Sequence, residues 1–559
     1  MALDPFRHLF GAWSHEVHLQ GGQTLARPGQ PLAALYRVIA GRIGELRASA
    51  DGGSQLVAVH RPGALIGGLE ALEDGLHHSE LVALRDSELR ALPIRRAERL
   101  LRRDPHILAE VARSALSRLS PQPQGGTAGR STMLGFLGLS GAVPVGALVR
   151  DLAAALRAHG CKIAVIDAQD GALEPAALSQ LETDNHLVLF AAEAGETLFA
   201  DYWSRQIDRL VLVADPATRP SPGPDSTHAA LGSRRLVDVV IIHPADARRP
   251  AGLDEWLSVG RASRLFHLRA GNAADLRRLS RMYSGRSVGL VLSGGGARAY
   301  AHVGVIRALH EMKVPIDVVA GTSMGAVIGA GLAMGWDLDE LDERLKDAFV
   351  ASSPLSDIAF PMLAMTHGHE VERRLEKHFG DTLIGDLWRP FACVSTDLTA
   401  GGQYVHSRGS LRLALRASLS LPGVLPPVVM DDHVLVDGAL VANFPADLVT
   451  ARHDGATIGV DVGQADGLRP SDLVAHPAGV SWLTTGAWLK GPPIVSVLIR
   501  AATVASEASV AAIYKTLDLV IAPDVNAIEL QDWKAYAPAA EAGYRATLTH
   551  SEALAKLAD

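Results

Sequence analysis

A serine flanked by glycines is the first feature of the sequence that could do chemistry. Residues 314–331 join an apolar, β-rich run to a helix of small residues through Gly321-Thr-Ser323-Met324-Gly325. A serine at the tip of such a strand-to-helix turn has a crowded backbone, so small residues are needed two positions to either side. Because the turn also opens a helix, the amide of Met324 should face the charge that develops on a carbonyl attacked by Ser323. The pattern predicts a nucleophile elbow.

A glycine-rich turn follows an earlier apolar strand, and its backbone could stabilise an anion. Residues 288–292 are strand-like, and residues 300–312 have the apolar spacing of a helix. The turn between them contains Gly294, Gly295 and Gly296, followed by Arg298. A dinucleotide loop would need glycine where Ala299 stands, and no acidic residue on a second strand about 20 residues later fits the ribose role. A right-handed β-α-β unit would place this turn beside Ser323, which favours an oxyanion loop.

A carboxylate at the end of a later strand completes the set. Val434-Leu-Val-Asp437-Gly438 delivers Asp437 into a turn. The three motifs together resemble the patatin-like phospholipases, which combine a glycine-rich oxyanion loop and a following Arg or Lys with a G-x-S-x-G serine and an Asp-Gly aspartate. Residues 417–423, followed by Pro426-Pro427, also look like that family's segment before the aspartate. The sequence departs from the family at Ala299, where many members carry glycine, and we expect a small effect.

The resemblance implies a role for each matching residue. Ser323 would be the nucleophile and Asp437 the group that takes its proton. The oxyanion hole would be formed by backbone amides among Gly294, Gly295, Gly296 and Met324. The supporting residues would be Arg298, which would fix the loop or help to place a phosphate, together with Gly321, Gly325 and Gly438.

The base that activates the serine has two possible identities. A conventional triad would use a histidine after Asp437, but none of the candidates lies in a motif; they are His453, His476 and His550. A lone carboxylate can serve if its site is apolar enough to raise its proton affinity, and we favour Asp437 in this role. We expect structural roles for the rival aspartates, which are Asp397, Asp431, Asp432 and Asp461.

The composition indicates a large cytoplasmic protein with several domains. Its 559 residues, 48% of them hydrophobic, are enough for about two to four domains. A formal charge of −8 argues against nucleic acid as the main partner. The two cysteines, Cys161 and Cys393, lie in apolar stretches, which indicates core positions in a reducing compartment. No signal peptide or long apolar span is evident, so we expect a soluble cytoplasmic protein, with peripheral association at a membrane left open.

Residues 1–120 contain short apolar runs separated by glycine turns, which predict a small β-barrel or jelly roll followed by helix. Residues 35–41 and 62–70 resemble parts of a cyclic-nucleotide-binding domain. Its phosphate cassette normally supplies a glutamate for the ribose and an arginine for the phosphate, but here Glu70 is displaced and residues 77–79 read His-His-Ser. Because histidine lacks arginine's permanent charge and fork, the sequence favours a degenerate regulatory or interaction module.

The remaining domains follow a flexible linker. Residues 121–131 are polar and rich in Pro and Gly, and residues 132–285 alternate strand-like and helical runs, which predicts a doubly wound α/β domain. Its first turn, residues 139–145, lacks the Gly-Lys-Ser/Thr of a P-loop, so we expect no nucleotide hydrolysis. Residues 286–559 would form a patatin-type α/β domain with a mainly parallel sheet. This domain order resembles the bacterial relatives of neuropathy target esterase.

Residues 481–511 are apolar and include Trp482 and Trp488. They fit a core helix, and they also fit a lid or a surface that contacts a membrane.

These features predict a serine esterase that hydrolyses acyl esters of phospholipids or lysophospholipids at a membrane or micelle surface, with no metal or other cofactor. Lysophospholipid is favoured by the family resemblance alone. Two other functions remain open: a non-catalytic scaffold with a patatin fold, and a Ser-His-Asp esterase for soluble esters. The sequence does not predict the head group, the chain length or the oligomeric state.

Overall fold

The computed structural model describes residues 10, 13–48, 54–105, 108–109, 111–112, 133–167, 173, 175–196, 202–203, 206–219, 236–252, 256, 262–351, 353–359, 364–463 and 513–558. The predicted linker at 121–131 and the apolar stretch at 481–511 lie outside these residues. The chain divides into two compact units: Met1–Ala247 with Glu255–Ser284, and Arg248–Asp254 with Gly285–Asp559. Within the described ranges, no helix has the length and hydrophobicity needed to cross a bilayer.

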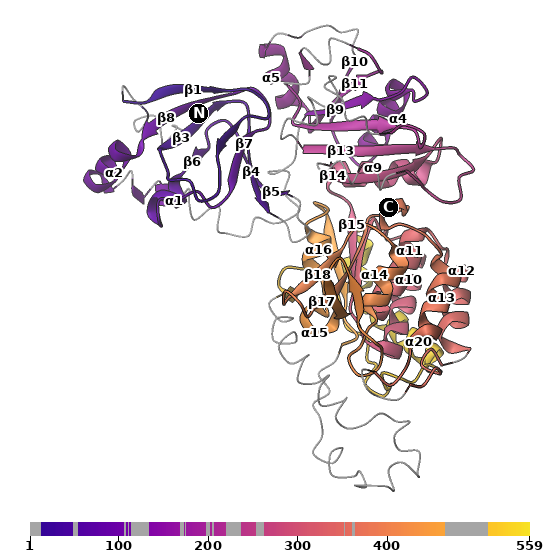
Figure 1. Cartoon of the computed structure of the whole chain (residues 1–559). Coiled ribbons are helices and arrows are strands. Elements are labelled where there is room, and N and C mark those ends of the chain that lie inside the picture. Colours follow the sequence, from indigo (N-terminus) through magenta and orange to yellow (C-terminus); the bar gives the residue numbers. More distant parts are fainter. Residues whose placement is uncertain are drawn as a thin grey trace. The chain divides into compact units, whose positions relative to one another are not determined.

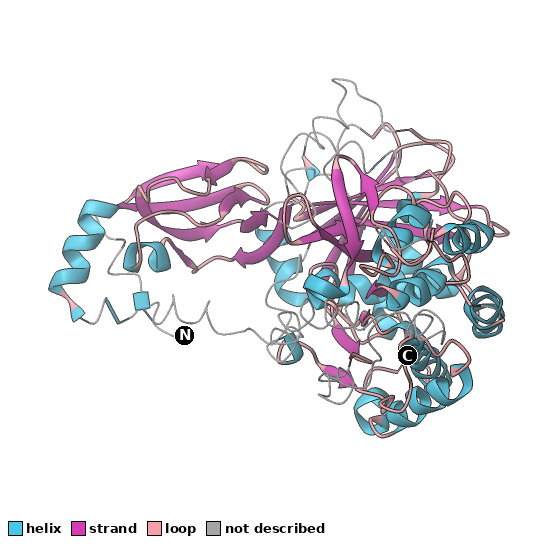
Figure 2. Cartoon of the chain, turned by 60° about the horizontal axis from the view of Figure 1, so that its bottom comes forward, coloured by secondary structure: helices cyan, strands magenta, loops and turns pink. Residues whose placement is uncertain are grey.

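The first part of unit one is a β-roll of two four-stranded antiparallel sheets, with strand orders β1-β8-β3-β6 and β2-β7-β4-β5 (Figure 1). Its strands are β1 His15–Leu19, β2 Thr24–Ala26, β3 Ala34–Ala40, β4 Ile43–Ala48, β5 Ser54–His60, β6 Leu65–Ile66, β7 Glu80–Ala83 and β8 Ser87–Pro93. The helices are α1 Gly68–Leu72 and α2 Ile94–Arg103. Figure 2 shows that strands make up most of this domain and that α2 lies at one end. The β-roll expected from the glycine-separated apolar runs is confirmed.

The second part of unit one is a six-stranded parallel sheet in the order β10-β11-β9-β12-β13-β14. Its strands are β9 Met133–Gly138, β10 Ile163–Asp167, β11 Leu187–Ala192, β12 Arg209–Ala214, β13 Leu236–His243 and β14 Ala262–Arg269. The helices are α4 Val145–Ala158, α5 Pro175–Asp184 and α9 Ala273–Ser284. Because the first strand is central and later strands extend the sheet in both directions, the predicted doubly wound topology is confirmed.

The turn after β9 is closed by a carboxylate from the neighbouring strand. At the N-terminus of α4, Glu193 accepts hydrogen bonds from the amides of Val145, at 3.2 Å, and Gly146, at 3.0 Å. In a P-loop protein, helix amides at this position would face a phosphate. Here the chain supplies its own anion, which fits the missing Gly-Lys-Ser/Thr.

Unit two contains a mainly parallel eight-stranded sheet, with β19-β20-β17-β16-β15-β21-β22 in order and β18 paired to β17. Strands β15, β16, β17, β21 and β22 are parallel, whereas β18, β19 and β20 join by antiparallel pairing. The strands are β15 Val288–Leu292, β16 Val318–Thr322, β17 Phe391–Asp397, β18 Gln403–His406, β19 Val428–Met430, β20 His433–Asp437, β21 Ala456–Val460 and β22 Leu519–Ile521. This arrangement confirms the predicted patatin-type sheet.

Helices cover the central strands of this sheet (Figure 1). They include α10 Ala301–Glu311, α11 Met324–Met334, α12 Leu338–Leu345, α13 His369–Phe379, α14 Leu411–Ser418, α15 Ala439–Ala442, α16 Ala446–Thr450, α20 Tyr536–Leu548 and α21 Ser551–Ala555. Glycines let α10 and α20 pack backbone to backbone: a Cβ on Gly304 would lie 1.7 Å from the Ala540 carbonyl oxygen, and one on Gly543 would lie 1.9 Å from that of Ala301. These contacts fix the helix that follows the glycine-rich turn.

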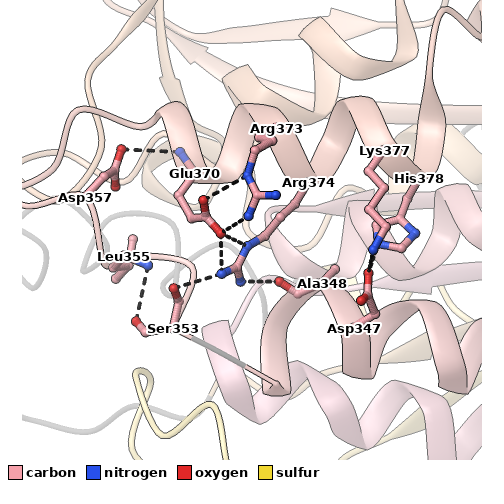
Figure 3. Close-up of polar contacts among 10 residues, drawn as sticks. All are labelled: Asp347, Ala348, Ser353, Leu355, Asp357, Glu370, Arg373, Arg374, Lys377 and His378. Carbon is pink, nitrogen blue, oxygen red and sulfur yellow. Dashed lines mark hydrogen bonds and ion pairs between the residues drawn. The ribbon is translucent and has the colours of Figure 1, made fainter.

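Helix α13 also anchors the segment that follows α12 (Figure 3). Glu370 binds Arg373 at 2.7 Å and Arg374 at 2.7 Å, and Arg374 donates to the carbonyls of Ala348 and Ser353. Because the Arg374 side chain is only 5% exposed, its contacts with Glu370, Ala348 and Ser353 are shielded from water and salt. The polar cluster therefore holds the α12–α13 connection against the helices behind the sheet.

Candidate active site

The predicted nucleophile elbow is present between β16 and α11. Ser323 has φ 53° and ψ −127°, an uncommon conformation for a residue with a side chain. A Cβ on Gly321 would lie 2.6 Å from the carbonyl carbon of Gly325, and one on Gly325 would lie 2.4 Å from the Ser293 carbonyl oxygen. Both positions therefore need glycine, as the sequence pattern indicates, and the turn presents Ser323 at the carboxyl edge of the sheet.

Ser323 and Asp437 are in direct contact. The Ser323 hydroxyl donates to Asp437 Oδ2 at 2.7 Å, and Asp437 Oδ1 accepts the Ala439 amide at 2.9 Å. Asp437 is only 2% exposed. Burial penalises the charged carboxylate and raises its pKa from 3.8 to about 6, while hydrogen bonds from Ala439 and Ser323 oppose the rise. The site pairs a hydroxyl with a carboxylate of increased proton affinity.

Strand pairing and a glycine place this carboxylate. Asp437 ends β20, opposite Ser395 of β17, which pairs with β16 on its other side. A Cβ on Gly438 would lie 2.3 Å from the Val394 carbonyl oxygen, so a side chain there would push the turn away from the sheet. The Asp-Gly pair thus lets the chain turn tightly enough to bring the carboxylate to the nucleophile.

The glycine-rich loop lies against the nucleophile, as the β-α-β arrangement predicts. The Ser323 Cβ lies 3.2 Å from the position that a Cβ on Gly294 would occupy. Within the described part of the chain, no protein group accepts a hydrogen bond from the amides of Gly295, Gly296 or Met324. These three amides lie on the glycine loop and on the elbow itself, and they could therefore serve an oxyanion.

Gly294 requires a correction to the expected set of donors. Its amide donates to the side-chain Oδ1 of Asn443 at 3.1 Å and lies 3.3 Å from the Asn443 carbonyl oxygen. An amide already bound in this way is not an open donor for a substrate oxyanion. Asn443 was not predicted from the sequence, and its only signal is its place six residues after Asp437, on the turn that follows α15.

Arg298 lies where it can fix the loop. Its side chain is 7% exposed, and its Nε donates to the Ile528 carbonyl at 2.6 Å. The amide of the preceding residue, Ala297, donates to the Leu530 carbonyl at 2.9 Å. These two contacts tie the glycine loop to the segment between β22 and α20, which fits the first of the two roles expected for Arg298.

Among the described residues, neither His453 nor His550, two of the histidines proposed as alternative bases, contacts Ser323 or Asp437. His453 lies 3.1 Å from Ser287 Oγ and 3.1 Å from Thr457 Oγ1, near the starts of β15 and β21, whereas Ser323 follows the end of β16. His550 precedes α21, and His476 lies outside the described residues. The geometry therefore favours a serine–aspartate pair over a triad.

The rival aspartates serve in turns and side-chain contacts. Asp397 accepts the amides of Thr399 and Ala400 and lies 2.6 Å from His433 Nδ1. Asp431 and Asp432, with φ 48° and 65°, form the turn between β19 and β20. Asp461 accepts the Gly463 amide and the Tyr514 hydroxyl. The structural roles expected for Asp397, Asp431 and Asp432 match these contacts.

The phosphate-cassette region of the β-roll contains no arginine fork at the expected position. His78 lies 3.2 Å from Glu73 and 3.2 Å from Asp74, so its ring already faces two carboxylates of its own loop. His77 is buried, and burial lowers its pKa, although the nearby charge of Glu70 acts in the opposite direction. Neither histidine reproduces a permanent, bidentate phosphate contact.

Two family models match the chain, one over the sheet that contains Ser323 and Asp437 and one over the β-roll. Residues 290–450 match the family model of the patatin-like phospholipases, and residues 16–104 match that of the cyclic nucleotide-binding domain. An uncharacterized NTE family protein of Mycobacterium bovis is 30% identical over 544 residues, which cover 94% of this chain and 90% of that protein. The chain belongs to the NTE family.

Similarity extends to mammalian proteins. Human patatin-like phospholipase domain-containing protein 6 is 29% identical over 537 residues, which cover 84% of this chain but 38% of the human protein. Among solved structures, the N-terminal domain of a Streptomyces coelicolor transcriptional regulator is 30% identical, with a TM-score of 0.19, and covers 21% of this chain and 82% of that one.

Proposed function

We propose that this protein is a serine esterase that hydrolyses acyl esters of phospholipids or lysophospholipids. The observation that carries the proposal is the 2.7 Å hydrogen bond from the Ser323 hydroxyl to Asp437, beside a glycine loop with open amides. Family membership supports a lipid ester as the substrate, and lysophospholipid is favoured over diacyl lipid on the same ground. The enzyme would meet this substrate at the surface of a membrane or micelle.

In the first step, Ser323 Oγ attacks the ester carbonyl carbon while Asp437 takes the hydroxyl proton. The carbonyl π bond opens, and the resulting oxyanion receives hydrogen bonds from the amides of Gly295, Gly296 and Met324. The intermediate then re-forms the carbonyl as the ester C–O bond breaks, and Asp437 returns the proton to the departing alcohol oxygen. Ser323 is left as an acyl ester.

In the second step, water replaces the alcohol. Asp437 takes a proton from the water as its oxygen attacks the acyl carbon, and the same amides hold the second oxyanion. Collapse of this intermediate breaks the bond to Ser323 Oγ, which recovers its proton from Asp437. A fatty acid leaves, and the enzyme returns to its starting state without a metal or redox group.

Burial suits Asp437 to both halves of this cycle. A carboxyl group with an ordinary pKa near 4 is a weak base, whereas one with a pKa of about 6 is mostly ionised at neutral pH and still accepts a proton readily. The short contact also supports transfer without an intervening histidine.

Covalent labelling combined with a lipid assay tests the proposal. The full chain should react with a fluorophosphonate at one residue, and peptide mass mapping should place the adduct on Ser323. Wild-type protein should release fatty acid from lysophosphatidylcholine micelles, and Ser323→Ala should lose both labelling and release. Fatty-acid release that survives in Ser323→Ala would reject the assignment, and labelling without any release from lysophosphatidylcholine or phosphatidylcholine would reject the substrate class.

A further inference from the structure

The nucleophile elbow needs support from outside its own strand and helix. Ser323 adopts φ 53°, a strained conformation for a residue with a side chain, and such a conformation persists only where the surrounding structure holds it. The glycines at 321 and 325 remove clashes, but they do not hold the Ser323 backbone. Its amide donates instead to the last residue of α14.

A buried serine at the end of α14 receives that amide. The Ser323 N–H donates to Ser418 Oγ at 2.9 Å, and the Ser418 hydroxyl donates to the Val394 carbonyl at 2.7 Å. Ser418 is 0% exposed, so water cannot replace either contact. Because its proton is committed to Val394, a lone pair of Ser418 Oγ faces the Ser323 amide in a fixed direction.

The same short segment also holds the backbone of the aspartate. The Asp437 amide donates to the Ser420 carbonyl at 2.9 Å. Ser420 is in turn fixed by Arg416, whose Nη1 donates to Ser420 Oγ at 2.6 Å. Residues 418–420 thus contact both members of the pair through backbone amides, from a segment that belongs to neither motif.

We propose that Ser418 is a positioning residue that holds the strained Ser323 backbone in register with Asp437. The inference rests on the proposed function of that pair. It gives a role to residues 417–423, which resemble a family segment but contain no group in contact with the reacting atoms. Loss of the Ser418 hydroxyl should let the elbow relax, and a displacement of about 1 Å at a reacting atom lowers turnover by up to about a hundredfold.

The test replaces Ser418 with alanine in the full chain and counts competent sites. Hydrolysis of p-nitrophenyl butyrate is measured, and kcat is expressed per site that a fluorophosphonate can label after exhaustive reaction. We expect kcat per labelled site to fall by about 10- to 100-fold, with KM within about twofold of wild type. The rate of fluorophosphonate labelling should fall in parallel.

Ser287→Ala is the matched control. Ser287 is also 0% exposed, and its hydroxyl contacts His453 at 3.1 Å near the opposite end of the sheet. A structural effect alone would lower the melting temperature and the number of labelled sites but leave kcat per site unchanged, and this is the result expected for Ser287→Ala. The same result for Ser418→Ala would overturn the proposal.

Two further variants keep the test decisive. If Ser418→Ala does not fold, Ser418→Cys fills the space with a weaker acceptor, and its kcat per labelled site should still be reduced; a normal value would reject the proposal. Ser323→Ala is measured in parallel. Hydrolysis that persists in Ser323→Ala would reject the proposed function itself. If Ser323→Ala loses hydrolysis but Ser418→Ala has a normal kcat per labelled site, only the positioning role is rejected.

Discussion

Replacing the buried carboxylate by an amide should stabilise the protein in a pH-dependent way. Asp437→Asn keeps the side-chain shape, so an oxygen can still accept the Ala439 amide while the new NH₂ donates to Ser323 Oγ. In the wild type, burial raises the pKa of Asp437 from 3.8 to about 6, so the fold favours the protonated acid. That stabilising preference is fully present below pH 3.8 and is lost as the pH rises through about 6.

The magnitude follows from the size of the shift. At about 1.4 kcal/mol per pKa unit, the ionised carboxylate makes the folded state about 3 kcal/mol less stable at pH 8 than a neutral group would. At pH 5 the same penalty is about half as large. The stability advantage of Asp437→Asn over wild type should therefore grow by about 1.4 kcal/mol between pH 5 and pH 8, which is about tenfold in an opening equilibrium.

Hydrogen exchange gives a local readout of this difference. Peptides from the buried strand Phe391–Asp397, which pairs with both β16 and β20, should be more protected in Asp437→Asn than in wild type. The ratio of protection between the two proteins should be about ten times larger at pH 8 than at pH 5, because intrinsic exchange rates cancel in the ratio. A ratio that does not change with pH would refute a raised pKa at Asp437.

Five other outcomes are expected. The kcat/KM of the wild type for a water-soluble ester should rise about tenfold per pH unit below pH 6 and level off above pH 7, because Asp437 must be ionised to act as a base; a flat profile would contradict this. Glu193→Ala should destabilise helix α4 by about 1 kcal/mol, seen as faster hydrogen exchange there, and calorimetry with Mg·ATP should detect no binding to the wild type. Cyclic AMP should show no micromolar binding in calorimetry, because His78 faces two carboxylates of its own loop. A polar residue at Trp482 or Trp488 should reduce the rise in hydrolysis on micelles more than hydrolysis of a short ester, whereas equal losses would indicate core positions.

The parts of the site that were predictable are glycines at fixed positions beside a motif residue. Gly321 is required by its contact with Gly325 within the elbow, whereas Gly325 and Gly438 are required because a Cβ would meet the carbonyl oxygens of Ser293 and Val394. Such requirements leave a fixed spacing in the sequence. The β-α-β connection then places the glycine loop beside the nucleophile, because parallel strands with a right-handed crossover bring their carboxyl ends to one edge.

The parts that were not predictable depend on contacts between distant segments. Asn443 meets Gly294 across 149 positions, and Ser418 meets Ser323 across 95. A single asparagine or serine has no periodicity or spacing that marks its partner. The sequence predicts Gly294 as an open donor because it does not show that a side chain 149 positions later already binds that amide.

In the α/β domain, too, the sequence predicts the local features but not the contacts between distant segments. The missing Gly-Lys-Ser/Thr after β9 and the alternating strands and helices were visible in the sequence. The carboxylate that takes the phosphate's place comes from Glu193, at the end of β11, and only the strand order brings β11 next to β9.

A double-mutant cycle for lysophosphatidylcholine hydrolysis tests the Ser323–Asp437 assignment most directly. The variants are Ser323→Ala, Asp437→Asn and the double mutant, each checked for folding by circular dichroism. If the two residues act as one unit, each single substitution should lower kcat by at least about 10³-fold, and the double mutant should be scarcely slower than either. An Asp437→Asn enzyme that keeps most of its activity, or a double mutant whose losses multiply, would contradict a serine–aspartate dyad.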